Sequence, residues 1–425
     1  MKTHLQGLLA FLILSAVLLS ACGGTGKVVQ SSLKRVAQPS TSTADDQAVV
    51  DGNTDFAFDL YQSLRTSSGN LVYSPYSISL AFAMAYGGAR GETASQIAHV
   101  LHYTLPDSQF PPAFNDLDLE LAQRPAQIMD VDPSERFSLN IANALWGQQD
   151  WSFLPQYLGL LATNYGAGMH LADFQKAPDS ARQQINNWVA DQTQKKIQNL
   201  VPPGAIDEAT RLVLVNAIYY KAFWEYPFDA NLTGPGPFTL LDGSPVNVPM
   251  MSNEGQEPLS YAVGNGWQVV ALPYKGGLTE MVILVPDAGT FGTFESSLTA
   301  AKYRQILAAM SPHPVILSMP KFTFNSQYQL GDTLSQMGMP DAFNVSQADF
   351  SGIDGAHDLF ISAVLHQAFV AVDEKGTEAA AATAIVMAGA AMPSGIQLTI
   401  DRPFLFFIQD VPTGTILFMG RVLKP

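Results

Sequence analysis

The sequence predicts an α+β fold from the order of its secondary-structure patterns. Helix-period patterns dominate the first part of the 425-residue chain, and strand-like runs dominate the last part. Helices and strands do not alternate regularly and no internal repeat is visible, so a parallel doubly wound sheet is disfavoured. Hydrophobic residues form 47% of the chain and aromatic residues 10%, which is ample for a large core.

The charge balance excludes one class of partner. The formal net charge is -15, whereas nucleic-acid binding needs a clustered basic surface. An acidic balance otherwise indicates little beyond solubility. Cys22 is the only cysteine, so no disulfide can form within one chain and stability must come from packing.

The N-terminus resembles a bacterial lipoprotein signal. Lys2 begins a short basic region, an apolar run extends from Leu8 to Leu19, and small residues lead to Cys22. We expect residues 1–21 to be a signal peptide and Cys22 to carry lipid after cleavage. Two or more acyl chains anchor a protein stably, so we expect export and attachment to the cell envelope, on its periplasmic or extracellular face. The alternative is an ordinary secretory signal with a chance cysteine.

Residues 22–50 are expected to form a flexible tether. Gly, Ser, Thr, Gln and Ala dominate this segment, which is too polar to fold alone. A chain of this length has a mean reach of about 30 Å. The folded domain would then span residues 51–425 and stand just off the membrane.

Helices and strands can be assigned along this domain in order. Asn53 or Thr54 can cap a first helix, Ser74 followed by Pro75 begins a second and very apolar helix, and another helix follows Asp179. Runs rich in β-branched and aromatic residues predict strands, and the run at 212–220 is typical of a strand covered on both faces. The predicted strands are 70–73, 140–146, 212–220, 269–272, 281–285, 315–319, 359–372, 404–409 and 416–422, the last two as a hairpin.

The stretch from Glu374 to Asp401 is unusual because it carries no charge between Glu378 and Asp401. The alanine run at 379–382 favours a helix, but glycines flank it and no amphipathic stripe faces a core. A membrane span would need about 20 apolar residues, and Pro393 cuts the run short. The third hypothesis is an exposed loop that can later enter a sheet as a strand. The segment alone leaves surface loop, helix and insertable strand open.

Enzyme and metal-site motifs are missing from the sequence. It has no Gly-x-Ser-x-Gly elbow, no phosphate-binding glycine loop before a helix and no His-Glu-x-x-His. A single cysteine excludes thiolate metal sites, and the seven histidines lack ligand spacing. His366 is a candidate base for a serine nucleophile, but a buried histidine satisfied by hydroxyls or an amide is the favoured interpretation. We therefore expect no cofactor, no metal and no enzyme activity.

Several separated stretches of this domain carry distinctive residues, among them Ser74-Pro75, 216–221 and 402–404. Together these stretches resemble the serpin family. They occur in family order over residues 51–425, so the match is specific. Ala222, Gln367 and Asp373 depart from the glycine, lysine and asparagine that are common in the family at these positions. The matching stretches are Ser74-Pro75, Ser77-Ile78, 88–93, Gln96-Ile97, Ile185-Asn186, Trp188-Val189, Thr193, Lys196-Ile197, 216–221, Trp224, Pro227-Phe228, 349–352, Ile361-Ser362, His366, 402–404 and 418–422.

The resemblance implies a monomer of three β-sheets and eight or nine helices, with Glu374 to Asp401 as an exposed reactive centre loop. Serpins mostly inhibit serine proteases, and some inhibit cysteine proteases. The protease cleaves the loop and forms a covalent acyl-enzyme, after which the loop inserts into the main sheet and distorts the protease. By the resemblance, Trp224 would be the aromatic residue at the point where insertion begins. The polar cluster beneath the opening sheet would consist of Ser74, Ser77, Asn216 and His366.

By the resemblance, the N-terminal part of the loop would form a hinge, and its composition suits insertion. Alternate side chains of a strand point to opposite faces, and the family register buries the face that begins at Thr377. That face holds small or β-branched side chains, while Glu378 falls on the other face, and no proline interrupts 374–392. The hinge residues are Glu374, Gly376, Thr377, Glu378, Ala379, Ala380, Ala381, Ala382 and Thr383, and the buried face would hold Thr377, Ala379, Ala381, Thr383 and Ile385.

Family spacing implies cleavage between Ala390 and Ala391, with Met387, Gly389 and Met392 as alternative specificity residues. The loop carries no Lys or Arg between residues 375 and 402, so a trypsin-like protease, whose pocket needs a cation, is disfavoured. We expect an elastase-like or subtilisin-like target, and a chymotrypsin-like one only if a methionine is used. The alternative is a non-inhibitory serpin that acts as a binding protein, although such members commonly lose the small-residue hinge.

Overall fold

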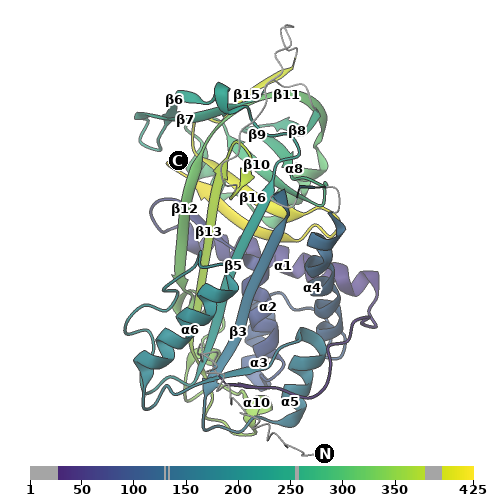
Figure 1. Ribbon diagram of the computed structural model, residues 1–425, viewed down its shortest axis with the longest axis vertical. Helices are drawn as coiled ribbons and strands as arrows, with labels where there is room; N and C mark the ends of the chain where they lie inside the picture. Colours follow the sequence, from purple (N-terminus) through teal and green to yellow (C-terminus); the bar gives the residue numbers. More distant parts are fainter. Residues whose placement is uncertain (1–26, 129–130, 133–134, 254–257, 379–394) are drawn as a thin grey trace, which may run out of the picture.

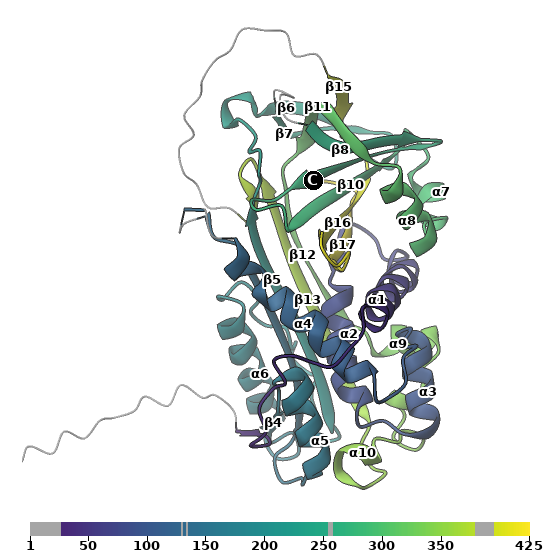
Figure 2. The same cartoon turned by 90° about the vertical axis from the view of Figure 1, so that its right-hand side faces the viewer.

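The α+β prediction is confirmed by a computed structural model of the protein, which describes residues 27–128, 131–132, 135–253, 258–378 and 395–425. A long main sheet runs along the molecule, shorter strands gather at its upper end, and most helices pack around its lower half (Figures 1 and 2). Two hydrophobic cores lie on either side of the main sheet, the larger one shared with the other strands and helices.

The main sheet has seven strands, and its central strand β5 (Leu212–Phe223) is covered on both faces as predicted. Leu212, Leu214 and Ile218 face the larger core, whereas Val213 and Val215 face the smaller core beneath α6 (Pro178–Gln192). In sheet order the strands are β1 (Val28–Val29), β4 (Met169–Ala172), β3 (Ser138–Gln148), β5, β14 (Gly376–Thr377), β13 (Ile361–Asp373) and β12 (Phe322–Gln329).

The other strands form two sheets that meet at β11 (Ser311–Pro320). The first half of β11 pairs with β8, and its second half pairs with β7 and β15, so the expected total of three sheets is reached. The predicted C-terminal hairpin is β16 with β17. The strands are β2 (Leu71–Tyr73), β17 (Ile416–Val422), β16 (Phe404–Asp410), β10 (Thr279–Pro286), β9 (Trp267–Pro273), β8 (Pro258–Gly264), β11, β7 (Pro245–Ser252), β6 (Gly234–Thr239) and β15 (Ile396–Thr399).

The described residues form ten α-helices, slightly more than the eight or nine expected. Helix α2 (Pro75–Tyr86) begins as predicted, because the Ser74 hydroxyl accepts a hydrogen bond from the Ser77 amide and Pro75 occupies the first turn. The remaining helices are α1 (Thr43–Leu64), α3 (Gly91–Val100), α4 (Phe110–Gln127), α5 (Pro155–Leu160), α6, α7 (Phe291–Ser296), α8 (Ala300–Ala308), α9 (Gly331–Met337) and α10 (Ser351–Asp354).

The first helix begins about three turns earlier than predicted. Ser42 caps it, and a reciprocal capping box joins the Ser42 hydroxyl to the Asp45 amide and the Asp45 carboxylate to the Ser42 amide. Asn53 and Thr54, predicted as caps, are buried inside the helix, where the Thr54 hydroxyl bonds to the Val50 carbonyl. The two acidic residues of the first turn further favour this start.

Residues 27–42, here called the N-terminal arm, differ from the expected flexible tether of residues 22–50. Strand β1 pairs antiparallel with β4 at the edge of the main sheet. Further along, the Arg35 guanidinium donates hydrogen bonds of 2.7 Å to Asn115 and 2.6 Å to Asp118 on α4. Backbone pairing and charged hydrogen bonds hold this polar segment in place without a large apolar core of its own.

Candidate functional site

The hinge enters the main sheet at its upper end. Gly376 and Thr377 form β14, which pairs antiparallel with β13 on one side and with β5 on the other. Below β14, strands β5 and β13 pair directly with each other, in parallel, over residues 361–368 of β13. The sheet is therefore already parted by two residues of the hinge at the point where β5 and β13 separate.

Gly376 fits this position because it lacks a side chain. A Cβ atom there would lie 2.0 Å from the Ala222 carbonyl oxygen and 2.8 Å from the Phe223 Cα atom, both backbone atoms of β5. Backbone atoms of a central strand cannot move aside without breaking the ladder. Only glycine therefore allows the hinge to approach β5 this closely.

Thr377 is the first hinge side chain that enters the core. It is 1% exposed, and its hydroxyl lies 2.6 Å from the Tyr274 hydroxyl. The Tyr274 ring stacks on Trp224, with ring centroids 4.5 Å apart. The Thr377 side chain therefore lies in a buried site that is lined by the aromatic rings of Tyr274 and Trp224.

Trp224 and Phe228 bind the backbone of the turn that joins β13 to β14. The Trp224 indole donates a hydrogen bond of 3.0 Å to the Asp373 carbonyl, and its amide donates one of 2.7 Å to the Lys375 carbonyl. The Phe228 amide donates to the Glu374 carbonyl at 2.8 Å. These three bonds fix the turn from which the hinge descends into the sheet.

Two ion pairs flank β14. Lys321 lies 2.7 Å from Glu374, which also accepts a hydrogen bond of 2.9 Å from the Thr233 hydroxyl. Burial raises the pKa of Glu374, but the bonds from Lys321 and Thr233 outweigh it, so the pKa lies below its ordinary value. On the other side, Lys196 pairs with Glu378.

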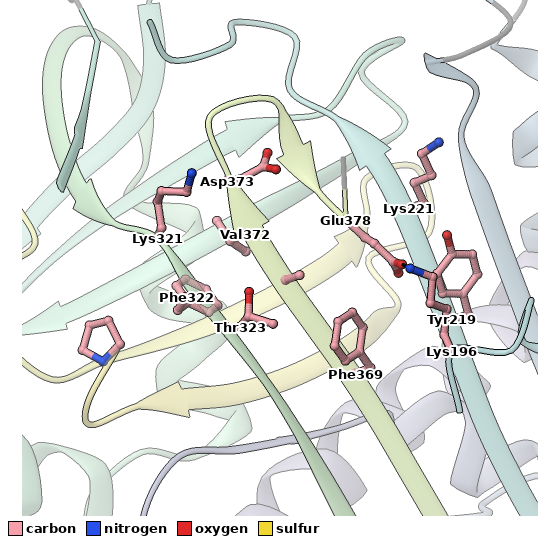
Figure 3. A pocket seen from close by; sticks show the side chains of 12 residues that line it. Lys196, Tyr219, Lys221, Lys321, Phe322, Thr323, Phe369, Val372, Asp373 and Glu378 are labelled. Carbon is pink, nitrogen blue, oxygen red and sulfur yellow. Dashed lines mark ion pairs between the residues drawn. The ribbon is translucent and has the colours of Figure 1, made fainter. Parts of the chain in front are cut away.

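Glu378 is the last described residue of the hinge. Its φ of 54° lies in the left-handed region, and its amide donates to the Ala371 carbonyl at 2.6 Å. Its carboxylate points toward Lys196 and Tyr219 at the edge of a pocket of about 560 Å³ (Figure 3). Burial raises the pKa of Glu378, although Lys196 opposes the shift.

A polar cluster lies beneath the middle of the same sheet. His366 is fully buried, and its Nε2 atom accepts a hydrogen bond of 3.0 Å from the Ser74 amide. Burial lowers the pKa of His366 to about 3, so its imidazole is neutral. Ser77 donates to Asn143 at 2.7 Å, and Asn216 lies opposite both Asn143 and His366 in the strand register.

The predicted site residues thus fall into two groups. Ser74, Ser77, Asn216 and His366 come together beneath the sheet, and Trp224 lies at its upper end beside the hinge. Sequence reasoning missed Asn143, Tyr274, Lys196 and Lys321 as members of the site. The remaining predicted positions lie outside the described residues: Cys22, Ala379, Ala380, Ala381, Ala382, Thr383, Met387, Gly389, Ala390, Ala391 and Met392.

The described residues of this region offer neither a free histidine base nor a metal site. Because the His366 Nε2 atom accepts a backbone hydrogen bond in a fully buried site, it is not free to take a proton from a serine hydroxyl. Across the described parts of the chain, His, Cys, Asp and Glu side chains nowhere gather in groups of three or more that could hold a metal. Those same residues include no helix long and apolar enough to cross a membrane.

Comparison with known proteins agrees with this architecture. A family model described as serpin (serine protease inhibitor) matches residues 51–425. The chain is 38% identical over 385 residues to leukocyte elastase inhibitor A of Mus musculus, covering 88% of this chain and 98% of that protein. It is 39% identical over 383 residues to an uncharacterized serpin-like protein of Thermococcus kodakarensis, covering 89% and 86% of the two chains.

Solved structures show the same fold. Native tengpin, a thermophilic serpin, matches with a TM-score of 0.79 and 27% identity over 93% of this chain and 100% of its own. Uncleaved ovalbumin matches with a TM-score of 0.77 and 29% identity over 89% and 100%. From the family match and the relatives above 30% identity, the chain belongs to the serpin family.

Proposed function

We propose that the protein is a suicide-substrate inhibitor of serine proteases, in which cleavage of the reactive centre loop is followed by insertion of the loop into the main sheet. The observation that carries this proposal is β14. A glycine and a small buried threonine of the hinge already pair with both strands between which the rest of the loop would have to pass. A loop that served only to bind a partner would have no need for this contact.

The observed register supports insertion of the following residues. Thr377 lies opposite Val372 of β13 and Ala222 of β5, both of which belong to the larger core. If the register continued downward, Ala379, Ala381 and Thr383 would face that core. The positions between them would face the α6 side, and no large or charged side chain would have to enter the core.

The same register would bring Thr383 to the polar cluster. Counting down from Thr377, residue 383 falls opposite His366 on β13 and Asn216 on β5. The Asn216 side-chain amide is fully buried and has no hydrogen-bond partner among the described residues. The Thr383 hydroxyl would supply a partner, and satisfying a buried polar group favours the inserted state.

Insertion would also replace the hydrogen-bond ladder between β5 and β13 with two ladders, one on each side of the inserted strand. The β5–β13 pairing is parallel, and parallel pairs are slightly less stable per residue than antiparallel ones. The inserted strand would be antiparallel to both neighbours, as β14 is. Alanine loses no side-chain entropy on burial, so the alanine-rich hinge suits this exchange.

We propose an elastase-like or subtilisin-like target, with Ala390 as the specificity residue. Small apolar side chains around Ala390 and Ala391 fit small apolar protease pockets, and the loop offers no cation for a trypsin-like pocket. Relatives named as leukocyte elastase inhibitors at 38% identity support this class of target.

The test is to incubate the chain lacking residues 1–22 with elastase-like, subtilisin-like, chymotrypsin-like and trypsin-like proteases. We expect a covalent complex that survives a denaturing gel with the first two, and cleavage between Ala390 and Ala391 by mass spectrometry. Clean cleavage without any complex would instead favour the alternative, a non-inhibitory serpin that binds a partner.

We also propose that Cys22 carries the lipid that anchors the exported chain to the cell envelope. The basic start, the apolar run and the small residues before Cys22 support this assignment. The mass of the N-terminal peptide tests it directly. A Cys22→Ser variant should leave the membrane fraction, and an unmodified N-terminal peptide in the native protein would refute the anchor.

A further inference from the structure

We propose that the outer face of the N-terminal arm is a membrane-contact surface, which turns the lower half of the anchored domain toward the bilayer and the reactive loop away from it. The proposal rests on the lipid anchor at Cys22. Beyond the anchor itself, the proposal specifies which surface of the domain contacts the lipid and on which side the loop is accessible to proteases.

The arm is fixed to the body of the domain at several points. Strand β1 pairs with β4, and the Leu171 amide donates to the Lys27 carbonyl at 2.8 Å. The Val36 amide donates to the Thr163 carbonyl at 2.9 Å, and Arg35 pairs with Asp118. A surface held in this way has one orientation relative to the domain.

The arm leaves three apolar side chains and two lysines exposed. Val28, Leu33 and Val36 are 40%, 57% and 42% exposed, and they are three of the nine large hydrophobic side chains that the described residues leave exposed. Lys27 and Lys34 beside them are also exposed. Apolar side chains next to lysines are typical of membrane interfaces, where the ammonium groups reach anionic headgroups.

The short connection to Cys22 requires this face to lie near the lipid. Residues 23–26 separate Cys22 from Lys27, and five extended steps of 3.8 Å reach at most about 19 Å. This is much less freedom than the full tether of residues 22–50 would have given. A lipid on Cys22 therefore keeps β1 within a short distance of the headgroups.

The reactive loop is attached at the other end of the molecule. Strand β4, which carries β1, lies in the lower part of the molecule, whereas β15, β6 and β7 lie at the top (Figures 1 and 2). Strand β15 is the element to which the loop returns at residue 396. With the arm on the bilayer, we expect the end that carries β15 to lie farther from the headgroups than β4 does, where a soluble protease can reach the loop.

The test is hydroxyl-radical footprinting of the full lipidated chain, free in detergent and reconstituted in vesicles of phosphatidylcholine and phosphatidylglycerol. We expect oxidation of Val28, Leu33 and Val36 to fall several-fold in vesicles. Oxidation of Leu241 and Val263, which are 58% and 67% exposed, should not change and serves as the internal control. In a Leu33→Asp variant, vesicles should no longer protect Val36 from oxidation. In a Leu241→Asp variant, vesicles should protect Val36 as in the native chain.

Failure of the anchor and failure of the contact surface are separable. If the native chain proves unlipidated, its Cys22 thiol can be coupled to a maleimide lipid in the same vesicles, and protection of the arm would still support the surface. Unchanged oxidation of the arm in the anchored chain would overturn the proposal. Protection of Leu241 and Val263 instead of the arm would show the opposite orientation and overturn it as well.

Discussion

At the scale of single residues, the site depends on how small Thr377 is. Its side chain is enclosed by the Tyr274 hydroxyl, the Trp224 ring that stacks on Tyr274 and the two strands beside β14. Tyr274 and Trp224 carry no charge, nor do Val372 and Ala222, the residues opposite Thr377 on the two strands. An unpaired buried cation is strongly unfavourable. Whatever replaces Thr377 must therefore be small and uncharged if the hinge is to stay in the sheet.

We predict that Thr377→Arg converts the inhibitor into a substrate. Insertion would have to bury the guanidinium beside Tyr274, so it should be slower than hydrolysis of the acyl-enzyme, and the protease should release a cleaved loop. The measurement is the stoichiometry of inhibition with the proteases that form complexes with the native chain. Thr66→Arg, at an exposed threonine, is the matched control. Stable complexes with Thr377→Arg at native stoichiometry would contradict the mechanism.

Glu374 supplies a prediction about pH. Its native pKa is depressed, so its contribution to stability is present above its ordinary value of 4.5 and is lost as the pH falls through the native value. Because Lys321 is 37% exposed, the pair should be worth about 0.5–1 kcal/mol. Glu374→Gln should therefore be less stable than the native chain at pH 7, and the difference should shrink as the pH is lowered toward 3.

Urea unfolding followed by tryptophan fluorescence at both pH values would measure this difference. Glu208→Gln changes an exposed glutamate in the same way and should have no effect at either pH. An equal loss at pH 7 and pH 3 would mean that Glu374 acts through packing and not through its charge.

At the scale of elements, β14 depends on Gly376, because only glycine allows its backbone to pack this closely against the backbone of β5. We predict that Gly376→Ala expels β14 from the sheet, since the added methyl would collide with the Ala222 carbonyl oxygen. Hydrogen exchange at residues 371–377 should increase, and the stoichiometry of inhibition should rise. Gly292→Ala is the matched control, because a Cβ there meets nothing within 4 Å. Unchanged exchange in Gly376→Ala would show that β14 tolerates a side chain.

Elements with a strong local pattern were predictable, and elements held by distant contacts were not. Strand β5 and the cap of α2 follow from the apolar run and from Ser74 with Pro75. The start of α1 was missed although Ser42 and Asp45 have capping-box spacing, because the polar composition suggested a tether. The arm lacks such a signal, since β1 is only two residues long and is ordered by β4.

The site shows the same limit. The grouping of Ser74, Ser77 and His366 beneath the sheet was predictable because the family resemblance covers these residues, whereas the hinge role of residues 374–383 stays a prediction. Three side chains that contact the hinge come from distant parts of the sequence. Lys196 follows α6, Lys321 precedes β12 and Tyr274 follows β9, and they are brought to the hinge only by the fold. No spacing along the sequence joins these positions to the hinge, so a single sequence could not identify them.

At the scale of the whole molecule, the proposed insertion would add one strand to the native main sheet. Its central pair, β5 and β13, is parallel and directly bonded below β14, while the Asn216 amide between them has no partner among the described residues. Both features would change together if the loop entered, because an antiparallel strand would bond to both neighbours and Thr383 would reach Asn216. The native state is thus expected to be less stable than the loop-inserted one.

We predict that cleavage of the loop raises the unfolding temperature by at least about 10 °C, a shift that corresponds to about 8 kcal/mol for a protein of this size. The chain would be cut by a protease that does not form a complex, freed of that protease, and compared with intact chain by circular dichroism. Thr377→Arg, cut in the same way, should show little or no rise because its hinge cannot pass into the core. Equal unfolding temperatures of cut and intact native chain would mean that the loop stays outside the sheet, and the proposed inhibition by insertion would then fail with it.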